Sequence, residues 1–237
     1  MRTLFVVLCS VSFALSVSGQ AGEKKTGDSR KALDKAVRTC SALKGYSFQI
    51  DERPGQGAGG TFQGKFEQGK PIFFLADKIE FLKKGDVLAY KEGDKWERSR
   101  TGTLSDPLRI LGAAAKVRGA RLPHEELAEL VKSMKDIQPA KEEPTSTVYS
   151  GIYQGRLDQA GARRLVPKSL EALAKEGQAK IWVGADGQVH KYSLTIRVQG
   201  RQGNAEIDGK VARTVLLNDR GTAKVVVPDE AKKALDK

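Results

Sequence analysis

The chain has 237 residues and a formal net charge of +12, with 41 Lys and Arg against 29 Asp and Glu, and 39% of its residues are hydrophobic. This length and composition are enough to bury a core, and they exclude wholesale disorder, collagen and a disulfide scaffold. No apolar run inside the chain reaches the ~20 residues that a membrane-spanning helix needs, so we expect a globular protein.

Residues 1–19 are typical of a secretory signal peptide. Arg2 supplies a positive start, Leu4–Val17 form an apolar stretch, and small residues precede a cleavage site predicted after Gly19, with Ala21 as a close second. A membrane anchor is the alternative, but the apolar stretch is short and no basic cluster follows at once. We therefore expect an exported protein, periplasmic or extracellular after cleavage.

The two cysteines favour neither lipidation nor a disulfide. Cys9 follows the bulky Leu8 and lies inside the apolar stretch, whereas lipidation needs a small residue just before the cysteine. Cleavage removes Cys9 and Arg2, which leaves Cys40 as the only thiol and a net charge of +11. A single thiol forms no internal disulfide, so stability must come from the core.

A single domain is predicted over residues 29–237, after a polar and flexible segment at residues 20–28. Its first helix begins at Ser29, repeats apolar residues at helical spacing as far as Cys40, and ends near Gly45. Short strands joined by turns follow at about ten-residue spacing, as in an antiparallel meander. These predicted strands are Tyr46–Glu52, Thr61–Gln68, Pro71–Ala76, Lys78–Lys83, Val87–Lys91 and Lys95–Arg98.

The middle of the chain is predicted to be helical and then to return to strands. Pro107 opens one helix, which runs to about Val117, and a second helix begins near Pro123. The next predicted elements are strands at Asp136–Glu142 and Thr145–Arg156 and a short helix at Pro167–Glu176.

The last third of the chain is predicted to form two hairpins separated by a polar loop. The first hairpin turns through Ala185-Asp186-Gly187, a strong turn signal, and the second turns through Asn218-Asp219-Arg220-Gly221. The predicted strands are Ala179–Gly184 and Gln188–Gln199, then Ala212–Leu217 and Ala223–Val227, with the loop at Gly200–Gly209 and a short helix at the C-terminus.

This order of elements predicts an α+β fold. No β-α-β alternation occurs, so a parallel sheet is not expected. We expect one large, twisted antiparallel sheet with helices on one face. A sheet of about ten strands curls, so the prediction is an incomplete β-barrel that a few helices close around a cavity.

The sequence offers no catalytic or metal-binding motif. Gly55–Gly60 match the dinucleotide-binding fingerprint, but an alternating strand pattern follows them where the phosphate-binding helix should begin. His124 and His190 are the only histidines, and with a single thiol they cannot supply a transition-metal site. The paired carboxylates of glycosidases leave no sequence signature, so that class stays open. We expect a protein that is not an enzyme and holds no metal or cofactor.

The positive charge is spread along the chain rather than clustered. Nucleic-acid-binding proteins concentrate basic residues beside stacking aromatics, so no nucleic-acid partner is expected. Attraction to an anionic membrane surface or a cell-wall polymer is the more natural consequence of this charge, and simple solubility is the alternative.

Three segments of the chain resemble a known family. They are the opening helix running into Leu43–Phe48, the strand and turn at Ala179–Gly187, and the segment Gly221–Pro228. Together with the order of elements, they resemble the LolA-like superfamily of periplasmic carriers, which includes LppX-type lipid binders. The resemblance implies an incomplete barrel whose apolar cavity shields acyl chains. Gly112–Ala115 are smaller than the residues of the family's helical lid, and no functional residue of the family is carried over.

If a cavity exists, apolar residues on one face of the strands form its wall. Alternation along the strands places these residues in pairs on one face, and for each residue taken singly, filling of a solid core is the favoured alternative. The candidate ligand-binding residues are Phe62, Phe66, Phe73, Ile79, Phe81, Leu88, Tyr90, Tyr149 and Tyr153.

Two functions fit these observations. The first is an exported carrier or binding protein for a lipidic ligand, either free lipid or the acyl chains of a lipoprotein. The alternative is a non-catalytic envelope protein that binds a partner protein or an anionic polymer. The oligomeric state is not readable from the sequence.

Overall fold

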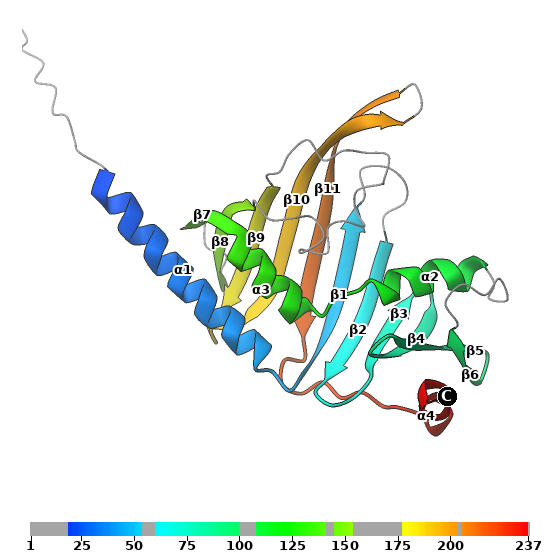
Figure 1. Cartoon of the computed structure of the whole chain (residues 1–237). Coiled ribbons are helices and arrows are strands. Elements are labelled where there is room, and N and C mark those ends of the chain that lie inside the picture. The colour runs from blue at the N-terminus through cyan, green and yellow to red at the C-terminus, as the bar shows by residue number, and fades with distance from the viewer. Residues whose placement is uncertain are drawn as a thin grey trace, which may run out of the picture.

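The computed structural model describes residues 19–53, 60–99, 108–140, 145–153, 177–202 and 205–236. Within these residues, eleven strands form one antiparallel sheet that is not closed into a barrel, and four helices pack on it (Figure 1). The predicted α+β class with a large curled antiparallel sheet is thereby confirmed. The strands are β1 (Gly45–Arg53), β2 (Gly60–Glu67), β3 (Ile72–Ala76), β4 (Ile79–Lys84), β5 (Val87–Glu92), β6 (Lys95–Ser99), β7 (Met134–Pro139), β8 (Ser146–Tyr153), β9 (Gly177–Gly184), β10 (Val189–Gln202) and β11 (Ala205–Asn218).

The sheet consists of two meanders that meet in its middle. The strand order is β6-β5-β4-β3-β2-β1-β11-β10-β9-β8-β7, so neighbours in the sheet are also neighbours in the chain except at one place. There the first strand pairs with the last, in antiparallel register from Ser47 opposite Asn218 to Arg53 opposite Ala212. Within the sheet, a single strand pair thus joins the N-terminal meander to the C-terminal one.

Three helices cover one face of this sheet, which we call the inner face. They are α1 (Gly19–Ser41), α2 (Leu108–Arg118) and α3 (Pro123–Ser133). α1 and α3 lie alongside each other across the β7 side of the sheet, and α2 lies over β3 and β4 (Figure 1). Their buried residues, such as Leu33, Val117 and Leu127, join the apolar residues of the strands in one large core. Burial of this shared core holds the helices on the sheet.

The fourth helix, α4 (Asp229–Asp236), lies on the opposite, outer face. It packs on β4, β5 and β6, where Leu82 and Ala89 form a second, smaller core with Ala231 and Leu235. The expectation that all helices lie on one face is therefore wrong. Because successive strand residues point to opposite faces, β4 places Phe81 in the inner core and Leu82 in the outer one.

The N-terminal helix is longer than predicted. It begins at Gly19, ten residues before the predicted start at Ser29. It ends at Ser41, and Gly45 does not cap it but begins β1. A Cβ atom on Gly45 would lie 2.5 Å from the carbonyl oxygen of Ala223, so glycine is needed here for close approach of two backbones.

The C-terminal hairpins differ from the prediction in two ways. β10 and β11 extend through most of Gly200–Gly209, so this segment is strand rather than a polar loop. Residues Ala223–Val227 do not form a strand, although their composition favours one. β11 already pairs with β10 on one side and β1 on the other, so no free edge is left for them. Instead, the backbone N–H of Val225 donates to a carboxylate oxygen of Glu67 at 2.8 Å.

The other predicted strands and helices are confirmed to within a few residues. The predicted signal peptide, the predicted helix at Pro167–Glu176 and most of Gly55–Gly60 lie outside the described residues. In the part of the chain that the structure describes, no helix is both long and apolar enough to span a bilayer.

Candidate ligand-binding site

The inner face of the sheet is lined by aromatic residues from adjacent strands. Phe48 and Phe62 lie on β1 and β2, and both contact Phe74 of β3, at ring-centroid distances of 5.7 and 6.4 Å. Further along the sheet, Phe81 and Tyr90 lie 6.5 Å apart. Together with the facing residues of α1, α2 and α3, they form a continuous apolar layer between sheet and helices. The region predicted to surround a ligand is this layer.

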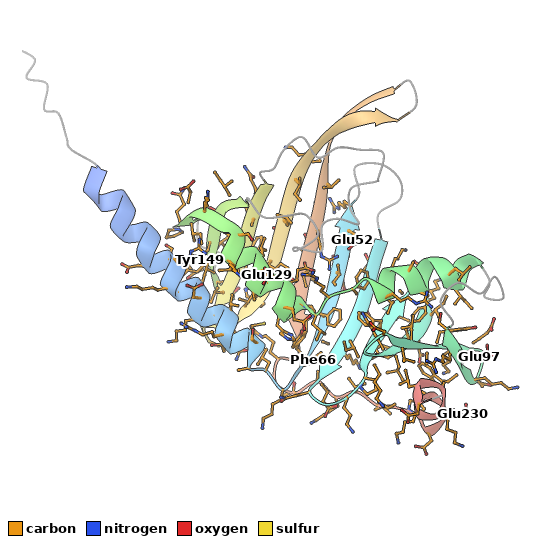
Figure 2. All side chains as sticks on the ribbon, viewed as in Figure 1. Glu52, Phe66, Glu97, Glu129, Tyr149 and Glu230 are labelled. Atoms are coloured by element: carbon orange, nitrogen blue, oxygen red, sulfur yellow. The ribbon has the colours of Figure 1, made fainter. Side chains whose placement is uncertain are left out.

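The structure brings most of the predicted wall residues together on the inner face. Five are buried in the inner core, and two more are half-buried against it. The buried ones are Phe62, Ile79, Phe81, Leu88 and Tyr90, and the half-buried ones are Phe66 and Tyr149. Figure 2 places Phe66 and Tyr149 at separate margins of the layer, at the end of β2 and on β8. The side chain of Tyr153 lies outside the described part of the chain.

Phe73 is the exception, because it does not lie on the inner face. It packs against the outer core beneath α4, and its neighbour Phe74 is the residue that points inward. Both faces of β3 are covered, by α2 on the inner side and by the outer core on the other, so its residues are apolar in succession and alternation could not show which side chain points inward. Its assignment to the same wall as Phe62 is therefore wrong.

The most unusual feature of the inner face is a buried ion-pair cluster. Arg213 of β11 is 1% exposed, and its Nε and Nη2 donate to the two carboxylate oxygens of Glu126 on α3, each at 2.8 Å. Its third nitrogen, Nη1, contacts the carboxylate of Glu52, which lies directly opposite on the neighbouring strand β1. Figure 2 shows Glu52 towards the end of β1. One guanidinium thus links two strands of the sheet to α3 (hereafter the Arg213 cluster, formed by Glu52, Glu126 and Arg213).

The two carboxylates keep the buried guanidinium charged. Burial alone would lower the pKa of Arg213, but the charge and hydrogen bonds of Glu126 outweigh burial, so the pKa of Arg213 is raised above its usual value. A fork of two parallel hydrogen bonds is the strongest arrangement that arginine forms with a carboxylate. The cluster therefore fixes where α3 sits on the sheet.

We did not predict the Arg213 cluster from the sequence, although a signal was present. Arg213 interrupts the apolar face that Val211, Val215 and Leu217 define at every second position of β11. Glu126 likewise precedes the buried Leu127 on the apolar side of α3. A charged residue on an apolar face is rarely buried unless it is paired, so two such residues of opposite sign indicate a pair.

A second polar contact joins the start of α3 to the sheet. The hydroxyl of the buried Tyr46 lies 2.7 Å from Nδ1 of His124, and the rings of Phe66 and His124 are 5.2 Å apart. The hydroxyl of the buried Tyr192 donates to the carbonyl oxygen of Pro123 at 3.2 Å. The first turn of α3 therefore rests on three aromatic residues of the sheet.

Burial of His124 makes the stability of the fold depend on pH. Burial lowers the pKa of His124, while the charge of Glu125 partly opposes this shift. The unfolded chain therefore binds a proton near pH 6.5, at a higher pH than the folded chain does. The free energy of unfolding therefore does not depend on His124 above about pH 6.5. As the pH falls from there towards the folded-state pKa, the free energy of unfolding decreases by up to ~1.4 kcal/mol per pH unit.

We expect His124→Phe to flatten this dependence, because phenylalanine fills the same space without titrating. Urea unfolding of both proteins at pH 7.5, 6.5 and 5.5 measures the effect, and the wild-type free energy of unfolding should fall more steeply towards pH 5.5. Parallel pH profiles for the two proteins would contradict the assignment.

The other end of α3 is held by α1. The guanidinium of Arg30 donates to the carbonyl oxygens of Val131 and Met134, at the C-terminus of α3. A cation at this position satisfies the last carbonyls of a helix and interacts favourably with its dipole. α3 is thus connected by polar contacts at its start, its middle and its end.

Two hollows open on the surface of the described residues. One, of about 730 Å³, lies where β9, β10 and β11 end, and polar residues such as Gln188 and Asn218 line it, together with the ion pair of Asp186 and Arg220. The other, of about 420 Å³, is a groove between α1 and α3 that Asp34 and Lys132 line with neighbouring residues. The first hollow is lined mainly by polar residues, and the second mixes charged residues with Val37, Ala128 and Val131, so neither is enclosed by the predominantly apolar lining that suits an acyl chain.

The described residues also contain no group of three His, Cys, Asp or Glu side chains that could hold a metal ion. Cys40 is buried on α1, and burial raises the pKa of its thiol to about 11. A thiol with so high a pKa is a poor nucleophile at neutral pH.

Comparison with known proteins identifies the fold. Neither a family model nor a curated protein matches the sequence. Among solved structures, the lipoprotein LppX of Mycobacterium tuberculosis aligns with 84% of this chain and 98% of its own, at a TM-score of 0.50 and 10% identity. LprF from Mycobacterium bovis aligns with 87% of this chain and 99% of its own, at a TM-score of 0.49 and 10% identity.

A LolA superfamily protein from Nitrosomonas europaea aligns over 88% of this chain and 97% of its own, with 12% identity and a TM-score of 0.30. The conclusion rests on LppX, whose alignment has the highest TM-score of the three. At this identity the likeness shows the fold alone: the chain shares the fold of LppX, one of the proteins that the sequence resemblance named.

Proposed function

We propose that the protein is an exported, non-enzymatic carrier that binds a lipidic ligand between the inner face of the sheet and helices α1, α2 and α3. The observation that carries the proposal is the continuous apolar layer on the inner face, which includes Phe62, Phe81 and Leu88. The sheet that carries this apolar layer is not closed into a barrel. Helices rather than further strands therefore complete the enclosure, and helices can separate from a sheet without breaking its hydrogen bonds.

Acyl chains suit such a layer energetically. Each methylene transferred from water into an apolar environment contributes about 0.8 kcal/mol. A ligand with one or two long chains buries many methylenes, and this gain opposes the loss of contacts between sheet and helices when they separate. The likeness to LppX supports the proposal at the level of the fold.

The direct test is whether the purified protein carries lipid. Mass spectrometry of an organic extract is expected to show an acyl-chain lipid in near-stoichiometric amount, with a denatured sample as the background. The delipidated protein should then bind a fluorescent fatty-acid probe. Clean extracts together with no probe binding would overturn the proposal and favour the alternative, a protein that binds an envelope partner.

Two variants locate the ligand. Phe66→Asp places a charge at the half-buried margin of the inner layer, and we expect it to weaken probe binding at least tenfold. Thr195→Asp is the control. Thr195 lies on β10 between the inward-facing Leu194 and Ile196, so its side chain points to the outer face, away from the proposed ligand. Circular dichroism checks that both variants fold. Equal loss of binding in both variants would place the ligand elsewhere.

A further inference from the structure

The Arg213 cluster contains more charge than the attachment of α3 requires. Among the described residues, Arg213 is the one basic side chain that is buried, and Glu126 is the one acidic side chain that is buried. Both lie inside the layer that we propose to be the ligand site. Buried ion pairs contribute little net stability compared with apolar residues of the same volume. An apolar pair would therefore hold α3 as well, which leaves the charges to be explained by something other than stability.

We propose that the guanidinium of Arg213 binds the anionic head group of the ligand, a carboxylate or a phosphate ester, and that Glu126 occupies this position in the unliganded protein. The inference rests on the proposed carrier function and names its ligand class. The edge formed by Nε and Nη2 already binds two oxygens of a carboxylate at 2.8 Å, in the fork geometry that matches both carboxylate and phosphate.

The arrangement of the partners separates a fixed part of the cluster from a movable part. Glu52 contacts Nη1 from the adjacent strand β1, directly opposite Arg213 in a register that runs the length of the strand pair. It therefore keeps the guanidinium in place when α3 moves. Glu126 belongs to a helix of 11 residues that lies outside the backbone ladder of the sheet. Hydrogen bonds of Arg213 to Glu126, of Tyr46 to His124 and of Tyr192 to the carbonyl oxygen of Pro123 attach it to the sheet. When α3 lifts away from the sheet, Glu126 leaves and the fork of Arg213 faces the layer.

This exchange makes the charge of the ligand matter. An anionic ligand replaces one carboxylate by another, so Arg213 stays paired, while Glu126 moves out into water, where a charge is stable. A neutral ligand of equal chain length would leave a buried guanidinium with one partner instead of two, which is unfavourable. The carrier should therefore select acyl chains with an anionic head group over neutral ones.

The test compares ligands that differ only in their head group. Palmitate and hexadecyl phosphate are titrated against hexadecanol by displacement of a neutral fluorescent probe. We expect the wild-type protein to bind both anions at least tenfold more tightly than the alcohol. Glu126→Gln, which removes the competing charge but keeps an acceptor oxygen, should strengthen the binding of all three ligands severalfold, because release of residue 126 from Arg213 then costs less, and it should keep the preference for the anions.

A double variant separates head-group binding from folding. Arg213→Met/Glu126→Leu removes both buried charges together and should bind all three ligands with equal affinity. Lys210→Met, which removes an exposed charge from the same strand, should keep the preference and so controls for net charge. Retention of the preference in the double variant, or equal affinities in the wild type, would overturn the inference and leave the carrier function standing. Failure of all three ligands to bind would overturn both.

Discussion

Glu126→Leu is expected to destabilise the protein by about 3–5 kcal/mol, because it leaves the guanidinium of Arg213 buried without its main partner. Arg213→Met should cost a similar amount, since it leaves the 2% exposed Glu126 unpaired. The double variant Arg213→Met/Glu126→Leu removes both charges and should recover most of the loss. Unfolding in urea of the wild type, both single variants and the double variant gives the coupling energy directly.

The outcome decides whether the two residues act as one unit. The expected result is a large coupling energy, with each single variant much less stable than the double variant. Additive losses would show that the two side chains do not interact in the folded protein. Ion pairs on a protein surface usually contribute less than about 1 kcal/mol. A loss this small for Glu126→Leu would show that the pair is exposed to solvent rather than buried.

Gly64→Ala is expected to have the second-largest effect, a loss of about 1–3 kcal/mol from overpacking. Gly64 lies on β2 directly opposite Phe48, and a Cβ atom there would lie 2.2 Å from Cζ of the Phe48 ring. That ring cannot move freely, because it also packs against Phe74 at a centroid distance of 5.7 Å. The substitution therefore disturbs the aromatic layer of the inner face as well as one strand.

Gly112→Ala is the matched control for this substitution. It makes the same chemical change on the helix α2, where no atom lies within 4 Å of the added Cβ. Alanine is a better helix former than glycine, so this variant should be more stable than the wild type by about 0.5–1 kcal/mol. Thermal unfolding measures the change in stability of each variant, which should be a loss for Gly64→Ala and a gain for Gly112→Ala. If both substitutions destabilise the protein, the loss at Gly64 does not come from the Phe48 contact.

The elements that were predicted well are those whose signals are local. Alternation along β1 places Phe48 and Ile50 on one face, and glycine-containing turns such as that at Gly93 separate short strands. Both signals depend on residues a few positions apart, so they are readable without knowing which strands become neighbours.

The errors occurred where a distant part of the chain decides the local structure. Val225 lies in a segment with strand-like composition, but the strand that would pair with it is already flanked on both sides. Phe73 and Phe74 are equally apolar and point to opposite faces of β3, and only the second core beneath α4 explains why the outward-facing Phe73 is apolar too. Arg213 and Glu126 are 87 residues apart, so neither residue by itself indicates its partner.

The pairing of β1 with β11 also sets the order in which the chain can fold. Ser47 Oγ donates to the carboxylate of Asp219 at 2.5 Å across 172 positions, so the centre of the sheet is its least local contact. Each meander can form on its own from neighbouring strands, but closing so long a loop costs entropy that local contacts do not repay, and such topologies fold slowly. A nascent chain that has not yet produced β11 therefore has no complete core, and the native state becomes accessible only after almost the whole chain has been synthesised.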